Sequence, residues 1–526
     1  MRQLVAAAAI AALVAAAGAG AMPHWTGEQL VAGGLAVAPN VAVNASGRAI
    51  AVWDDETGPD CATAPASLGC IHTVTVRDKP AAGAAWGGGS GIARPGVDSR
   101  PVVAIDGAGT AAVLWVHDIG ADRFVQAVLR DTPTGQWPNA EDISKEVLSV
   151  GAHELALDDA GDAVAVWVQR TASGPELREA LRSAALRFWG AARLLSSGAV
   201  TGGASLAVTG AGDAVVVWIE NGVVRAGRGS LHSDTWSSGL PLSSSNGEAV
   251  GDPAVAVNAR GDAVAVWQWR DRLTGQSIVQ AAYDPAGSSW APAKDLGNAA
   301  AGIAGAPQAA IDAGGNGLVT WLATPGPTLQ SAAVTPTGAW SSTVGVATRR
   351  AAEPRLAMAP DGNAVAVWID VASATVRASG WPAAARAWQP RVTLSQAGAS
   401  VPRLAMDQAG GAVAVWNEGT GANVALMGAD LLGDWKPALA NTRPPSIAGS
   451  ARPGRTLACR RGLWDGTVPI RYAYAWLRNG RAIVRAHGSN YVVRLADRGA
   501  GLACRVTATN AARSLTAVSP PVRVAR

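Results

Sequence analysis

The sequence is poor in the residues that most often carry recognisable chemistry. Its 526 residues include 4 Cys, 6 His, 2 Phe and 4 Tyr, and only four of its 43 basic residues are Lys. Four Cys are too few for a scaffold that depends on disulfides, and six scattered His argue against a metal enzyme. We therefore expect no metal site and no cofactor, and no catalytic residue can be assigned, because zinc-protease, phosphate-loop and nucleophile-elbow motifs are all missing.

The N-terminus is expected to be removed. Arg2 precedes an apolar run over residues 4–17, and Ala19-Gly20-Ala21 is a plausible cleavage site. Residues 1–21 are therefore predicted to be a signal peptide. No second apolar run of about 20 residues follows, so we expect no membrane span after its removal. The predicted location is secreted, either extracellular or associated with the cell surface.

Tryptophan is abundant instead, with 21 copies, and much of it belongs to an internal repeat. One phrase, VAVNASGRAIAVW in its first copy, recurs eight times with a period of about 52 residues. A Gly stands six residues before the Trp in every copy, and Asp or Asn stands nine before it in six copies. The repeats end at Trp53, Trp115, Trp167, Trp218, Trp267, Trp321, Trp368 and Trp416.

Each copy has the pattern of a β-hairpin. Apolar residues alternate on both sides of the turn, as they do in two strands of period two. Asp or Asn can start a type I turn, and Gly can take the left-handed position that closes it. The Trp at the end of the second strand is then placed to fill the gap between neighbouring sheets.

A second Trp series and a further apolar segment raise the number of expected strands to four in each repeat. Four short strands in about 50 residues are typical of a β-propeller blade. We predict an all-β protein in which residues 22–441 form a propeller of about eight four-stranded blades. Nine strands of the second Trp type accompany eight hairpins, so either Trp25 or Trp435 is spare or one of them closes the ring. Seven blades with one degenerate unit remain an alternative, as does a β-solenoid.

The last part of the chain, residues 442–526, has a different pattern. It resembles a bacterial immunoglobulin-like domain of the kind found on secreted and surface proteins, through GLWDG, YAYAWLRNG and LACRVTATN. The order Cys459, Trp476, Cys504 is that of a sandwich held by a disulfide. Leu502 stands where antibody-type domains have a tyrosine. The repeat region resembles secreted bacterial repeat proteins in general, which implies no particular activity.

Four Cys allow three pairings. We favour Cys459–Cys504, which the resemblance implies, and Cys61–Cys70 within one long loop of the first repeat. Both would fit an exported, oxidised protein.

Charge differs sharply between the two regions. Residues 442–526 contain 15 Arg and two Asp, a net charge of +13, whereas the remainder carries −9. This asymmetry predicts either an anionic polymer as partner of the C-terminal region or a compositional bias without function. Docking of the basic region on the acidic propeller is a third possibility.

The candidate binding residues follow the hairpin Trp by two positions, where equivalent loops of a propeller meet. Acidic residues predominate there, and the loops that follow vary in length. The predicted ligand-binding residues are Asp55, His117, Gln169, Glu220, Trp269, Asp370 and Glu418. An alternative is that these polar residues only mark where each strand enters water.

These patterns favour a secreted, non-catalytic binding or adhesion protein that recognises a cell-envelope glycan or a surface protein through its propeller loops. The alternative is an extracellular carbohydrate-active enzyme, a hydrolase or lyase, whose propeller channel carries acidic residues. A purely structural envelope protein is a third hypothesis. Propeller enzymes assemble their sites from several blades, so a missing motif does not exclude catalysis.

Overall fold

The computed structural model describes residues 23–58, 61, 70–93, 97–119, 122–233, 235–244, 246–286, 289–297, 303–324, 326–421, 423–433, 435, 439–465, 470–509 and 514–525. The predicted signal peptide, residues 1–21, lies outside the described residues. The chain divides into two compact units, Trp25–Leu432 and a second that comprises Met1–His24 and Gly433–Arg526. No helix among the described residues has the length and apolar character needed to cross a membrane.

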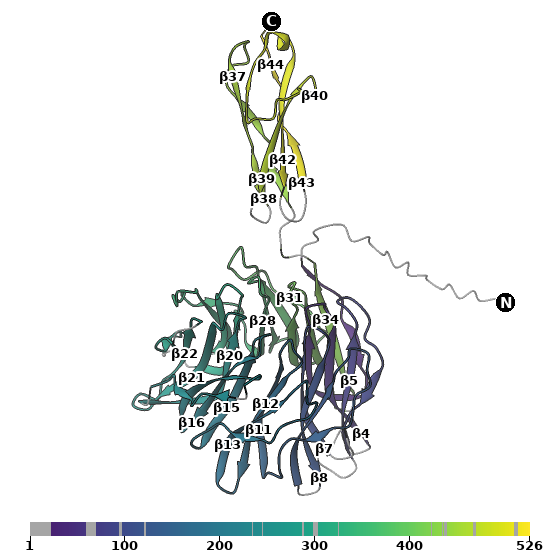
Figure 1. Ribbon diagram of the computed structural model, residues 1–526, viewed down its shortest axis with the longest axis vertical. Helices are drawn as coiled ribbons and strands as arrows, with labels where there is room; N and C mark the ends of the chain where they lie inside the picture. The colour runs from purple at the N-terminus through teal and green to yellow at the C-terminus, as the bar shows by residue number, and fades with distance from the viewer. Residues whose placement is uncertain are drawn as a thin grey trace, which may run out of the picture. The chain divides into compact units, whose positions relative to one another are not determined.

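The first unit contains eight antiparallel sheets, numbered here in chain order (Figure 1). Sheet 1 has β3 (Leu35–Val43), β4 (Ala49–Thr57), β5 (Ile71–Lys79) and β6 (Gly89–Gly91). Sheet 2 has β7 (Val97–Ile105), β8 (Ala111–Ile119), β9 (Asp122–Arg130) and β10 (Glu141–Asp142). Sheet 3 has β11 (Ser149–Leu157), β12 (Ala163–Thr171), β13 (Gly174–Arg182) and β14 (Arg193–Leu194). Sheet 4 has β15 (Val200–Val208), β16 (Asp213–Glu220), β17 (Val223–Ser230), β18 (Thr235–Trp236) and β19 (Leu240–Pro241).

The remaining four sheets repeat this order. Sheet 5 has β20 (Gly247–Val257), β21 (Ala263–Asp271), β22 (Ser277–Asp284) and β23 (Lys294–Asp295). Sheet 6 has β24 (Ile303–Ile311), β25 (Gly317–Ala323), β26 (Thr328–Val334) and β27 (Val344–Gly345). Sheet 7 has β28 (Ala351–Met358), β29 (Ala364–Asp370), β30 (Thr375–Trp381) and β31 (Val392–Thr393). Sheet 8 has β32 (Ala399–Met406), β33 (Ala412–Thr420) and β34 (Asn423–Leu432), with β1 (His24–Trp25) and β2 (Gln29–Ala32) paired to β34.

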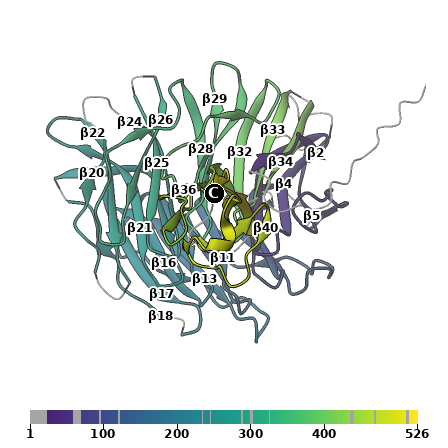
Figure 2. The same cartoon turned by 90° about the horizontal axis from the view of Figure 1, so that it is seen from above.

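The sheets form a closed ring. The first strand of each sheet contacts the first strand of the next, from β3 through β7, β11, β15, β20, β24 and β28 to β32, and β32 contacts β3 again. Seen from above, the outer strands β5, β18 and β22 lie on the periphery (Figure 2). The expectation of an all-β chain built from four-stranded sheets is confirmed, and the ring is consistent with a β-propeller-like fold.

The ring is closed by pairing the two ends of the first unit. Strand β2 is antiparallel to β34, and the backbone N–H of Thr26 donates to the carbonyl oxygen of Asp430 at 2.8 Å. The Lys79 ammonium of sheet 1 lies 2.7 Å from a carboxylate oxygen of Asp430, and both side chains are about 1% exposed. Of the arrangements left open by the extra Trp, the structure therefore has the N-terminal strands completing the last sheet.

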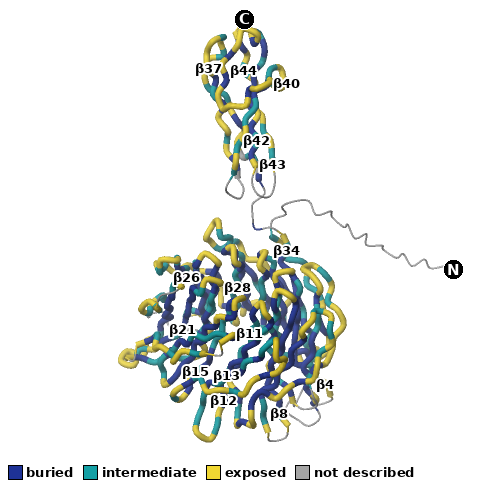
Figure 3. Tube along the Cα trace, in the orientation of Figure 1, coloured by how far each residue is buried: buried dark blue, intermediate teal, exposed yellow. Residues whose placement is uncertain are grey.

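The core lies between the sheets. The second strands are buried almost throughout, whereas most turns and loops are exposed (Figure 3). Trp167 of sheet 3 packs in an apolar cluster with Leu114 and Val116 of sheet 2, and Trp53 of sheet 1 packs with Val415 of sheet 8. These Trp side chains thus fill the interfaces between neighbouring sheets, as the repeat predicts.

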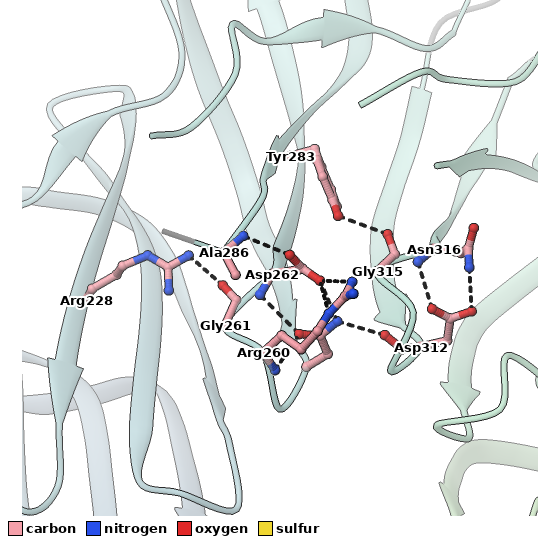
Figure 4. Close-up of polar contacts among 10 residues, drawn as sticks. Arg228, Arg260, Gly261, Asp262, Tyr283, Ala286, Asp312, Gly315 and Asn316 are labelled. Atoms are coloured by element: carbon pink, nitrogen blue, oxygen red, sulfur yellow. Dashed lines mark hydrogen bonds and ion pairs between the residues drawn. The ribbon is translucent and has the colours of Figure 1, made fainter. Parts of the chain in front are cut away.

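The hairpin turns also have the predicted geometry. Gly161 has φ of 83°, and the Gly of every other copy is likewise in the left-handed region. The Asp158 Oδ1 accepts hydrogen bonds from the backbone of Ala160 and Asp162, each at 2.9 Å. The turns are also tied to neighbouring sheets, as Figure 4 shows for Tyr283 of β22, whose hydroxyl donates to the carbonyl of Gly315 in the turn of sheet 6 at 3.0 Å. The recurring spacing of Asp or Asn, Gly and Trp therefore has a structural role, which is to form the hairpin turns.

The second unit is also built from strands. Strand β35 (Ala440–Arg443) pairs with β38 (Leu463–Asp465), and β36 (Ser446–Ala448), β37 (Thr456–Arg460) and β41 (Asn490–Val492) form a second sheet. The third sheet contains β39 (Arg471–Arg478), β40 (Arg481–Ala482), β42 (Gly501–Thr509), β43 (Ser514–Val518) and β44 (Val522–Arg523), and a short 3₁₀ helix, η2, spans Leu495–Asp497.

Both predicted disulfides are present. Cys459–Cys504 joins β37 to β42, and Cys61–Cys70 closes a loop in sheet 1. The buried Trp476 stacks on Tyr491 beside the first of these bonds, with ring centroids 5.3 Å apart. Two disulfides are typical of proteins from an oxidising compartment.

Candidate functional site

The first strand of every sheet, which faces the axis of the ring, carries a bulge. The antiparallel register shifts near the middle of each of these strands, for example between Ala352 and Arg355 and between Ser400 and Arg403. Six of the eight strands have Pro at this point, and Pro cannot donate to the ladder. These residues are Pro39, Pro101, Pro253, Pro307, Pro354 and Pro402.

The residue before this Pro is often strained. Arg100, Glu353 and Val401 have φ of 52°, 50° and 50°, in the left-handed region that side chains with a Cβ rarely adopt. Bulges re-aim the following side chains, and strained backbone is frequent at functional sites. The bulges therefore indicate that a functional site is to be expected at the axis of the ring.

Charged side chains gather beside these bulges. Glu154 on β11 is within electrostatic reach of Asp252 on β20, Arg355 on β28 and Arg403 on β32. Glu353 also interacts electrostatically with both Arg355 and Arg403. Because sheets 3, 5 and 7 are not neighbours in the ring, these groups can influence one another only across its axis. We call Glu154, Asp252, Glu353, Arg355 and Arg403 the axial cluster.

Burial changes the acid–base behaviour of this cluster. Burial raises the pKa of Glu154 to about 7, repulsion from Asp252 adds to the shift, and Arg355 and Arg403 oppose it. Burial also lowers the pKa of Arg403 to about 10, with repulsion from Arg355 as the next cause. A carboxyl group with a pKa near 7 can both donate and accept a proton at neutral pH.

Local packing holds the cluster in place. The Arg355 and Arg403 guanidinium groups each donate to the carbonyl of the preceding Pro, at 2.8 and 3.0 Å. A Cβ on Gly203 would lie only 1.9 Å from the Asp252 Oδ1, so a residue without a side chain is needed beside that carboxylate. These contacts fix two cations and one anion in the same region.

An open cavity lies where the hairpin turns converge. Its volume is about 330 Å³, and turns from six sheets line it, with Asp106, Asp159 and Asp407 among them. Leu157, three residues beyond Glu154 on the same strand, also lines it. This volume is in the range of small-ligand sites.

The residues predicted from the positions after the hairpin Trp are placed differently. Gln169, Glu220 and Glu418 each accept a hydrogen bond from the indole N–H of the Trp two residues earlier, at 2.7, 3.0 and 3.1 Å. Indole donors buried between sheets need such acceptors. These side chains therefore support the sheet interfaces.

The other predicted residues have equally local contacts. His117 is buried with its Nδ1 2.5 Å from the Asp98 Oδ1, and Trp269 packs in the apolar cluster between sheets 4 and 5. Asp370 is buried, and Asp55 is half-buried with its pKa raised, chiefly by burial. The structure does not gather the seven residues into one site, and their binding role stays a prediction.

Two further groups could hold a metal ion. Asp158, Asp162 and His232 come together at a hairpin turn, where only His232 of the three is exposed, with the His232 Nε2 2.7 Å from Asp158 and 3.4 Å from Asp162. Asp54, Glu56 and His72 form a second, more buried group. Glu56 also lies near Cys61 and Cys70, but sulfurs joined in a disulfide are not thiolate ligands.

The axial cluster was not predicted from the sequence. Its members stand 13 or 15 residues before the hairpin Trp; in sheets 5, 7 and 8 they flank the recurring Pro, whereas Glu154 stands in a sheet that lacks it. That Pro, repeated within an otherwise regular strand, is the signal that could have revealed the bulges.

Comparisons with known proteins give structural likeness only. No family model and no curated protein matches the chain. An ulvan lyase described as a new family of polysaccharide lyase is 9% identical, with a TM-score of 0.43 over 78% of this chain and 96% of that one. A Hadza microbial sialidase is 11% identical, with a TM-score of 0.36 over 62% of this chain and 77% of that one. A leech intramolecular trans-sialidase is 8% identical, with a TM-score of 0.35 over 76% of this chain and 68% of that one.

These neighbours correct one expectation. They are sialidases and a polysaccharide lyase, whereas the sequence pattern favoured a non-catalytic binding or adhesion protein, and that prediction is corrected here; at 8–11% identity the likeness itself extends to the fold alone. The sequence pattern favoured a non-catalytic protein because it contains no catalytic motif, and a local motif cannot describe charged residues that come together from separate repeats.

Proposed function

We propose that the protein is an extracellular carbohydrate-active enzyme that acts on an acidic polysaccharide at the axis of the ring. The observation that carries the proposal is Glu154, a carboxyl group with a pKa of about 7 that faces Arg355 and Arg403 across the axis. The proposal assigns the proton transfers to Glu154 and the binding of the substrate's anionic group to the two arginines.

The chemistry of the cluster suits cleavage of a glycosidic bond. A protonated Glu154 can donate to the leaving oxygen, and its ionised form can remove a proton from water or from a sugar carbon. Two guanidinium groups can hold a carboxylate or sulfate through charge-assisted hydrogen bonds. Asp252 or Glu353 would supply the second carboxylate that hydrolysis requires.

The test replaces the acid–base group while keeping its shape. Glu154→Gln should lower the rate of depolymerisation by about 10²- to 10⁴-fold, because a positioned acid–base group typically contributes that much. Glu146→Gln, at an exposed position, is the matched control. The substrates are polyuronates, sulfated polysaccharides and neutral glucans, with melting temperature measured in parallel.

The products distinguish the two reaction classes. Elimination yields an unsaturated sugar that absorbs in the ultraviolet, whereas hydrolysis yields only new reducing ends. Equal activity of Glu154→Gln and the parent protein would refute the role of Glu154. Cleavage of neutral glucans alone would refute the role given to the arginines.

We also propose that the second unit is an immunoglobulin-like module of a secreted protein that binds an anionic polymer. The support is the disulfide between β37 and β42, the buried Trp476 and the net charge of +13 over residues 442–526. Binding of the intact chain to a polyanion should weaken steeply with salt. Retention that is independent of salt would argue against this electrostatic role.

A further inference from the structure

A second cavity lies away from the axis, on sheet 7. It has a volume of about 460 Å³ and is lined by Arg349, Arg377 and Arg391, with Asp370 and the edge of the buried Trp368. Three guanidinium groups face one carboxylate, so the lining carries an excess of two positive charges. We call this cavity the arginine pocket.

The charges inside the arginine pocket are incompletely paired. The Arg377 Nε lies 3.8 Å from the Asp370 Oδ2, which is too far for a hydrogen bond. Among the residues that the structure describes, this buried Nε has no hydrogen-bond partner. Arg391 is exposed and donates one hydrogen bond to the Thr348 hydroxyl at 3.0 Å. Guanidinium donors therefore remain for a ligand.

Sheet 4 has different partners at the same position. Arg225, which pairs with Trp218 as Arg377 pairs with Trp368, lies 3.2 Å from Glu220 and donates to the carbonyl of Gly239 at 3.0 Å. The Ser197 hydroxyl and backbone N–H also bond to Glu220. Glu220 and the Gly239 carbonyl therefore hold Arg225 more closely than Asp370 holds Arg377, although the Nε of Arg225, like that of Arg377, has no hydrogen-bond partner among the described residues.

The two outer arginines of the pocket replace glycines of sheet 4. Arg349 stands two residues before the strand partner of Asp370, and the residue two before the strand partner of Glu220 in sheet 4 is Gly198. Arg391 stands two residues before the strand partner of Arg377, and the residue two before the strand partner of Arg225 is Gly239. In sheet 4 a Cβ on Gly239 would lie 2.3 Å from the Trp218 ring. Sheet 7 therefore has room for cationic side chains that the equivalent position excludes.

From this geometry we propose that the arginine pocket is a second glycan subsite, which binds the carboxylate or sulfate group of an acidic sugar. Arginine forks match the planar oxygens of a carboxylate and bind sulfate oxygens equally well. The volume suits one sugar unit. The inference rests on the proposed function for the class of ligand, but the pocket is separate from the axial cluster.

The test measures binding rather than catalysis. Glucuronic acid, inorganic sulfate and glucose are titrated by calorimetry into the intact Glu154→Gln protein at low ionic strength. The double variant Arg349→Gly/Arg391→Gly, built in the same background, restores the residues of sheet 4. Arg187→Gly is the matched control, because Arg187 is an exposed arginine whose φ of 61° suits glycine.

We expect glucuronic acid to bind the parent protein and the control equally, and the double variant at least tenfold more weakly or with one site fewer. Competition by sulfate would show that the pocket accepts either oxyanion, whereas its absence would restrict the pocket to carboxylates. Glucose should not bind. Unchanged affinity and stoichiometry in the double variant, equal binding of glucose, or no binding of either anion would overturn the proposal. A failure of Glu154 as acid–base group would appear in the depolymerisation assay and leave this binding result unaffected.

Discussion

The interfaces between sheets and the axis of the ring are built from the same repeat, but they use it in opposite ways. At the interfaces every copy keeps its Trp, its buried second strand and its left-handed Gly. At the axis the equivalent positions differ from copy to copy, with Glu154 in one sheet, Arg355 and Arg403 in two others and Ala254 in a fourth. Close packing tolerates little change, so the identical positions report the fold. The positions at the axis vary from copy to copy, and the proposed function rests on them.

The largest effect should come from emptying an interface. Trp167→Ala removes a fully buried indole and leaves a cavity against sheet 2, so we expect a loss of about 3–5 kcal/mol in the free energy of unfolding. Denaturant unfolding of the parent and variant proteins measures it. A loss below about 1 kcal/mol would mean that the Trp are not the main packing elements.

The closure of the ring provides the next test. Lys79→Met should destabilise the first unit by about 3–5 kcal/mol, because it leaves the buried Asp430 carboxylate without its cation. Replacing both residues, as Lys79→Met/Asp430→Leu, removes the unpaired charge and should recover much of the loss. If the double variant were as unstable as the single one, the charge would not be the cause.

The pH dependence of stability should separate the axis from the interfaces. Since the pKa of Glu154 is raised from 4.5 to about 7, the folded chain retains a proton that the unfolded chain releases in this range. Stability contributed by this group is therefore highest below about pH 4.5 and falls as the pH rises towards 7. Glu154→Gln removes the effect and should gain on the order of 1–3 kcal/mol relative to the parent between pH 4.5 and 8. A difference between the two proteins that is constant with pH would show that Glu154 has an ordinary pKa.

The smallest effect concerns the turns. Gly161→Ala places a Cβ in the left-handed region and should cost about 1–2 kcal/mol. Gly27→Ala is a suitable control, since a Cβ at Gly27 would meet no atom within 4 Å and the φ of this residue lies outside the left-handed region. Equal melting temperatures for the two variants would contradict the turn assignment.

Much of the architecture followed from the sequence alone, because strand alternation, turn chemistry and Trp spacing are local properties repeated eight times. The four-stranded sheets and the hairpin turns were predicted in this way, whereas the Cys459–Cys504 pair followed from the resemblance to an immunoglobulin-like domain. The tertiary structure decided which strand completes the last sheet, since Trp25 and Trp435 have equivalent local patterns, and it is the N-terminal strand β2 that pairs with β34, with Thr26 bonded to Asp430.

The tertiary structure also decided where the candidate site lies. The sequence pattern predicts that residues two positions after each hairpin Trp are available to a ligand. In the structure, Glu220 and Glu418 instead accept hydrogen bonds from the indole N–H groups of Trp within the sheets. Glu154, Arg355 and Arg403 are about 50 to 250 residues apart in the chain and meet only when the ring closes. Their shared surroundings raise the pKa of Glu154, and because burial is a property of the assembled ring, no local pattern could have predicted that shift.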